Sequence, residues 1–154
     1  MVMSETTAHE ALARFLHQIA APRLPDLAYV WHTANESAGG AKTAGGIPLD
    51  VLKEARAGVV AGVWDWLYLG PNRQPVNDMG AFFFQGVAIE LKSSKAYRTD
   101  NHGLSPEQDA WMTRYICNGW YTAVFPENDW VGAAHLFVRW VGGNVEDFNF
   151  GRRS

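Results

Sequence analysis

Two short stretches of the chain carry the residue types that metal-assisted hydrolysis needs. Asp65 lies within an apolar, aromatic run, and Glu90-Leu91-Lys92 closes a later apolar run. Carboxylates are hard oxygen ligands that suit Mg²⁺ or Mn²⁺, and a nearby lysine can position or deprotonate water, or offset the charge that develops. The pattern therefore predicts a metal-assisted site, while it also fits a salt bridge on a half-exposed strand.

The elements that carry these residues are predicted to form an antiparallel hairpin. The segment 62–69 has the β-branched and aromatic content of a buried strand, with Asp65 early on it, and 81–92 resumes as a second strand. The turn-rich segment 70–80 separates the two. Glu90 and Lys92 are two residues apart and project from one face, so three charged groups converge if the register places Asp65 opposite.

The charge pair on the second strand needs a physical reason. Glu90 and Lys92 interrupt the apolar run 87–91 on a strand that should be well covered. Unpaired charge on a buried strand is costly to stability, so this position favours the metal-assisted site over a salt bridge.

The other patterns predict one α/β domain with a mixed sheet and helices on its faces. Ser105-Pro106-Glu107-Gln108 is a capping box that begins a helix ending at Gly119. Further predicted elements are a helix over 7–21 stopped by Pro22 and Pro25, a short strand over 28–32, a loop over 35–46, a short helix over 49–57, a strand over 120–125 and a helix over 131–141. The domain is expected over 1–143, followed by a tail over 144–154.

Bulk properties limit the classes of protein. The 154 residues are 47% hydrophobic and 19% charged, which excludes a disordered chain. Cys117 is the single cysteine, and residues 1–21 are interrupted by charges, so we expect a soluble protein of the bacterial or phage-infected cytoplasm. The net charge of −3 does not favour general binding to nucleic acid, so any such binding depends on local groups of basic residues. The alternative is that the lysines are scattered and simply solvated.

Four motifs in order resemble the VRR-NUC branch of the PD-(D/E)XK nucleases, over about Ser4 to Val141. They are Asn35-Glu36, the segment 58–65 ending in Asp65, the segment 86–92 with Glu90-Leu91-Lys92, and the segment 104–111 with Gln108. The resemblance implies a restriction-endonuclease-like α/β core and metal-dependent hydrolysis of DNA that leaves a 5′-phosphate. It also implies branched, flapped or four-way DNA as substrate, and a phage-type homodimer.

Site residues follow from the resemblance by position. Asp65, Glu90 and the backbone carbonyl of Leu91 are expected to hold Mg²⁺ or Mn²⁺, and Lys92 is the expected catalytic lysine. Gln108 matches an active-site glutamine, although the capping box also explains it. The family places a further acidic residue in its first helix; Glu5 fits best, with Glu10 or Glu36 as alternatives. The candidate DNA contacts are Asn35, Glu36, Lys42, Lys53, Arg56 and Lys95.

The chain departs from the family pattern at two places. Trp64 stands where the family has proline, and Val59-Val60-Ala61 replaces its usual basic residues, so Lys53 or Arg56 would have to supply that phosphate contact.

Two other classes of protein stay open: a binding module in which Trp66 or Trp130 stacks on a base or sugar, and a phage structural protein. The five histidines have no zinc spacing and are expected to be surface or interior groups.

Overall fold

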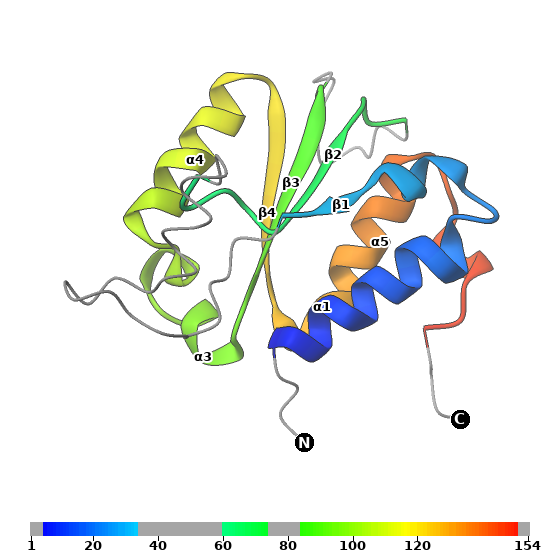
Figure 1. Cartoon of the computed structure of the whole chain (residues 1–154), viewed down its shortest axis with the longest axis horizontal. Coiled ribbons are helices and arrows are strands. Elements are labelled where there is room, and N and C mark those ends of the chain that lie inside the picture. The colour runs from blue at the N-terminus through cyan, green and yellow to red at the C-terminus, as the bar shows by residue number, and fades with distance from the viewer. Residues whose placement is uncertain (1–4, 34–59, 74–83, 151–154) are drawn as a thin grey trace, which may run out of the picture.

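The computed structural model describes residues 5–33, 60–73 and 84–150. A four-stranded sheet lies between two layers of helices, with strand order β1-β2-β3-β4 (Figure 1). Strand β2 is antiparallel to both β1 and β3, whereas β3 and β4 are parallel. The strands are β1 (Trp31–His32), β2 (Trp66–Leu69), β3 (Gly86–Lys92) and β4 (Trp120–Pro126). This is the predicted α/β fold with a mixed sheet flanked by helices.

Strand β3 is central and nearly fully buried, as its apolar sequence requires. It pairs with β2 from Trp66↔Ile89 to Leu69↔Gly86, so the predicted hairpin is confirmed. Two helices, α3 (Ser94–Tyr97) and α4 (Pro106–Cys117), make the crossover to β4. A crossover of this kind is what allows β4 to run parallel to β3.

Helices α1 (Glu5–Arg14) and α5 (Trp130–Trp140) cover one face of the sheet (Figure 1). The chain continues beyond α1 as a π-helical stretch (Phe15–Ala20), so the helix predicted over 7–21 is confirmed in extent. Apolar side chains of these helices meet the odd-numbered residues of β3 in the main core. Phe148 and Phe150, in the segment predicted as a tail, also pack against that core.

Helix α4 covers the other face. Its predicted capping box is present: the Ser105 hydroxyl accepts from the Gln108 backbone, and the Gln108 side chain accepts from the Ser105 N–H. A second, smaller core forms between this helix and the sheet, from Trp64, Leu67, Ala88 and Tyr115.

Strand β2 is shorter than predicted. It begins at Trp66, so Asp65 lies just before the ladder and not on it. At this point the Asp65 N–H bonds to the Glu90 side chain. Just before it, Gly62 has a left-handed φ of +83° and closely approaches the first turn of α4. The predicted strand over 28–32 is a 3-10 turn (Pro25–Tyr29) followed by the two-residue β1. The loop over 35–46, the helix over 49–57 and positions 74–83 lie outside the described residues.

Short 3-10 turns complete the described parts of the chain (Asp100–Gly103, Glu127–Asp129 and Val145–Asp147). Within the described ranges, no helix is both long and apolar enough to cross a membrane.

We predict that Gly62→Ala lowers the free energy of unfolding by about 2–4 kcal/mol, since a left-handed alanine costs about 1–2 kcal/mol and steric overlap adds to it. A Cβ at Gly62 would lie 2.6 Å from the Cβ of Glu107. The matched control is Gly119→Ala, because Gly119 has a φ of +78° and its added Cβ would meet only the Gln85 side chain at 3.5 Å. Urea unfolding measures both, and equal losses would contradict the proposed close approach.

Candidate active site

The candidate site lies where β2 and β3 separate. The antiparallel ladder ends at Trp66↔Ile89, and Asp65 and Glu90 are the next residues along the two strands. Both carboxylates are buried, with 5% of Asp65 and 2% of Glu90 exposed. The convergence of the two acidic residues that the sequence suggested is therefore present in the structure.

Each carboxylate bonds to the backbone of the opposite strand. The Asp65 N–H donates to Glu90 Oε2 at 3.2 Å, and the Leu91 N–H donates to Asp65 Oδ2 at 2.9 Å. These two side-chain bonds take the place of ladder bonds that the separating strands no longer make. The carboxylates are therefore fixed by the same backbone groups that the strand separation exposes.

Asp65 is also held on its other side, by β1. Its carbonyl accepts from the Thr33 N–H at 2.7 Å, and the Thr33 hydroxyl donates to the Trp64 carbonyl at 2.6 Å. The segment that carries Asp65 is thus bonded to Thr33, the residue after β1, on one side and to β3 on the other, which restricts the position of its carboxylate.

Lys92 and Gln108 complete the cluster from β3 and α4. The Lys92 ammonium lies 3.2 Å from Glu90 Oε1 and donates to Gln108 Oε1 at 2.6 Å. The Gln108 amide nitrogen donates to Glu90 Oε1 in a short hydrogen bond. The two interpretations of Gln108, as a helix-capping residue and as a residue of the site, are therefore compatible, because one amide makes both sets of contacts.

The charges of the cluster favour a cation. Burial raises the pKa of the Glu90 carboxyl above its ordinary value, and the Lys92 ammonium and the hydrogen bonds from Lys92 and Asp65 act in the opposite direction. Two buried carboxylates face the single ammonium that the described residues place beside them, that of Lys92. An oxygen-rich site with excess negative charge has the donor set that Mg²⁺ or Mn²⁺ requires, so the residues fit such an ion.

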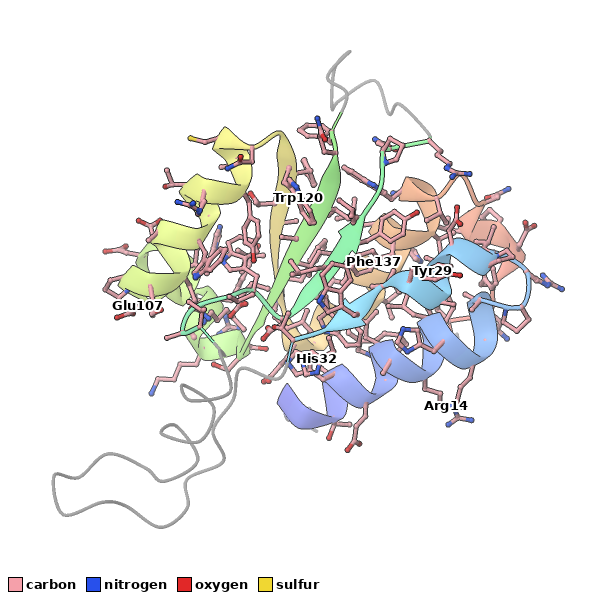
Figure 2. All side chains as sticks on the ribbon, turned by 45° about the horizontal axis from the view of Figure 1, so that its top comes forward. Arg14, Tyr29, His32, Glu107, Trp120 and Phe137 are labelled. Atoms are coloured by element: carbon pink, nitrogen blue, oxygen red, sulfur yellow. The ribbon has the colours of Figure 1, made fainter. Side chains whose placement is uncertain are left out.

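Two histidines that the sequence interpretation set aside lie at this site. His9 on α1 is buried, and its Nε2 is 3.8 Å from Asp65 Oδ2. His32 ends β1 close to α1, and its ring centroid is 4.6 Å from that of His9 (Figure 2). Ligand atoms of His9, His32 and Asp65 lie within 4.8 Å of one another. No spacing in the sequence signals this group, because three separate elements supply it.

The remaining predicted site residues have different outcomes. Glu10 is exposed on α1, and Lys95 is exposed on α3. The side chain of Glu5 lies outside the described part of the structure, as do Asn35, Glu36, Lys42, Lys53 and Arg56. Their predicted roles stay predictions.

The two tryptophans named in the binding-module alternative both pack against the main core. Trp66 is 1% exposed and belongs to that core, so it is not available to stack on a base or sugar. Trp130 is half-buried and packs against the same core. An inward position on β2 explains the burial of Trp66, since it pairs with Ile89 under α1.

The mixed sheet between two helical layers forms a single α/β domain with a restriction-endonuclease-like fold. Among solved structures, the chain is similar to one described as a VRR_NUC domain protein, at 16% identity and a TM-score of 0.57, with 93% of each chain covered. The fold implied by the resemblance is thereby confirmed. The chain matches no model of a protein family and no curated protein.

We predict that Gln108→Ala lowers the free energy of unfolding by about 2–3 kcal/mol, since it removes a helix cap and leaves the buried Glu90 carboxylate and the half-buried Lys92 ammonium each short of a hydrogen-bond partner. Ser105→Ala is the control, because it removes only the cap and should cost about 1 kcal/mol. Chemical unfolding of both variants without metal measures the difference. Equal losses would mean that the bonds to Glu90 and Lys92 contribute nothing to stability.

Proposed function

We propose that this protein is a divalent-metal-dependent DNA endonuclease that hydrolyses phosphodiester bonds. The observation that carries the proposal is the cluster of the buried Asp65 and Glu90 with the half-buried Lys92 at the separation of β2 and β3. The likeness of the fold to a VRR_NUC domain protein supports it. Buried charges of this kind are costly to stability, and an active site gives a reason to keep them.

Asp65, Glu90 and the carbonyl of Leu91 would hold Mg²⁺ or Mn²⁺. The Leu91 N–H points to Asp65, and in an extended strand the carbonyl of the same residue points to the same side. All three ligand groups therefore come from the two strands that separate here. The chemistry that such an ion would supply when bound is polarisation of the phosphoryl oxygen and a lower pKa of coordinated water.

Lys92 is the proposed catalytic lysine. Its ammonium lies on the face of β3 that carries Glu90, and Gln108 holds it in place by accepting a hydrogen bond from it. The Lys92 ammonium, held at this point, can orient the attacking water and offset the negative charge that develops on the phosphate. Gln108 is then a residue that positions both Lys92 and Glu90.

Branched, flapped or four-way DNA is the proposed substrate class. The net charge of −3 gives the body of the protein no general attraction for DNA, so contacts must come from local basic groups near the site. Lys95, exposed on α3 three residues after Lys92, is one candidate for a phosphate contact. Such contacts position the DNA without reading its sequence.

We expect Lys92→Ala to slow cleavage by about 100-fold or more and to leave Mn²⁺ binding in place, because it removes charge stabilisation and no metal ligand. Lys95→Ala, a matched loss of a nearby exposed lysine, should weaken DNA binding with little effect on the rate at saturating DNA. The assay uses linear, nicked, flapped and four-way DNA in Mn²⁺, with EDTA as the metal-free arm.

Three outcomes would count against the proposal. Cleavage that persists unchanged in EDTA would exclude the metal mechanism. Wild-type rates in Lys92→Ala would remove the lysine from the mechanism. Retention of DNA without cleavage of any substrate would favour a binding module in place of an enzyme.

The affinity for a divalent metal should fall at low pH, because Glu90 must lose its proton to bind the ion. Because burial raises the pKa of this carboxyl, the metal-free protein keeps its proton to a higher pH than an ordinary glutamate does. A bound cation requires the deprotonated form, so the affinity for Mg²⁺ should fall, by up to about tenfold per pH unit, as the pH drops through that raised pKa. Above it, the affinity should level off.

Calorimetry in two buffers of different ionisation enthalpy measures the proton released on Mg²⁺ binding. Glu90→Gln is the control, because it has no proton to release at this position. An affinity of the wild type that is constant across the acidic range would place Glu90 outside the metal site.

A further inference from the structure

His9 lies between a hydrogen-bond donor and a carboxylate. The indole Nε1–H of Trp66 donates to His9 Nδ1 at 2.9 Å. The other ring nitrogen, His9 Nε2, is 3.8 Å from Asp65 Oδ2. The imidazole therefore lies between the core tryptophan of β2, to which it is hydrogen-bonded, and the first carboxylate of the site, which it faces.

The bond from Trp66 fixes where the proton of His9 resides. An indole nitrogen can only donate, so Nδ1 must present a lone pair to it. A neutral imidazole with a lone pair on Nδ1 carries its proton on Nε2. The group that His9 turns toward Asp65 is consequently an N–H donor.

This arrangement does not suit His9 as a metal ligand, although His9, His32 and Asp65 lie close enough to surround an ion. To bind a cation through Nε2, the ring would need its proton on Nδ1, where the Trp66 N–H already points. Histidines that bind metals donate their other ring N–H to an acceptor, and Trp66 offers a donor there.

We propose that His9 is a positioning residue for Asp65, because its Nε2–H faces, at 3.8 Å, the same Oδ2 that accepts from the Leu91 N–H. This distance is too long for a direct hydrogen bond, so His9 acts through electrostatic attraction, which favours the carboxylate orientation that the Leu91 N–H fixes. His32 supports this arrangement by packing against both rings: its ring centroid lies 4.6 Å from that of His9 and 4.8 Å from that of Trp66. The role in metal binding rests on the proposed function, whereas the tautomer does not.

The tautomer can be measured directly in the full chain. Proteins labelled with ¹⁵N in histidine give separate NMR signals for protonated and unprotonated ring nitrogens, and the His9→Gln variant assigns the His9 signals. We expect an unprotonated Nδ1 and a protonated Nε2, both without metal and with Mg²⁺ or Zn²⁺ added. A protonated Nδ1, or a Zn²⁺-bound Nε2, would overturn the proposal.

Two substitutions test the positioning role through metal affinity. Gln offers an acceptor for Trp66 and a donor for Asp65 in one amide, whereas Leu fills similar space and offers neither. Calorimetry should give a Mn²⁺ affinity within about threefold of wild type for His9→Gln, and a loss of about 10–100-fold for His9→Leu. Circular dichroism checks that both variants are folded.

The outcomes separate the inference from the proposed function. Equal losses in both variants would indicate a ligand role for His9, and wild-type affinity in both would remove the positioning role. If the wild-type protein binds no Mn²⁺, the proposed function fails, while the NMR measurement still decides the tautomer.

Discussion

The site depends on the exchange of hydrogen bonds between Asp65 and the Glu90-Leu91 segment. Strands β2 and β3 separate beyond Trp66↔Ile89, which would leave backbone N–H groups without ladder partners. The two carboxylates accept hydrogen bonds from these N–H groups. The acidic side chains are therefore fixed by the backbone groups that the strand separation leaves without partners. The central position of β3 makes this opening a buried one, and burial is what raises the pKa of Glu90.

The elements around this opening each serve the sheet and the site together. Gly62, just before β2, has a left-handed φ and lets the chain pass close to the first turn of α4. Gln108 caps α4 and also bonds to Lys92 and Glu90. On the opposite face, α1 buries its apolar side against the sheet and carries His9 to Asp65. Stability and site geometry are therefore coupled through the same side chains.

The elements with a strong local signal were predictable. Ser105 to Gln108 has the capping box that begins α4, because a cap is formed by residues three apart in sequence. The apolar period of the first helix and the two runs of the hairpin also predicted α1, β2 and β3. The start of β2 was predicted too early, since the Asp65 N–H bonds to the side chain of Glu90, which is 25 residues away in the chain.

The sequence by itself determined the residue types of the site: two acids, a lysine and a glutamine at spacings that put Glu90 and Lys92 on one face. The tertiary structure decided the register that brings Asp65 to Glu90, and the packing that brings His9 and His32 to Asp65. Local periodicity sets which way a side chain points along one element. It carries no information on which residues of α1 and β1 meet across the core, because that depends on how separate elements pack.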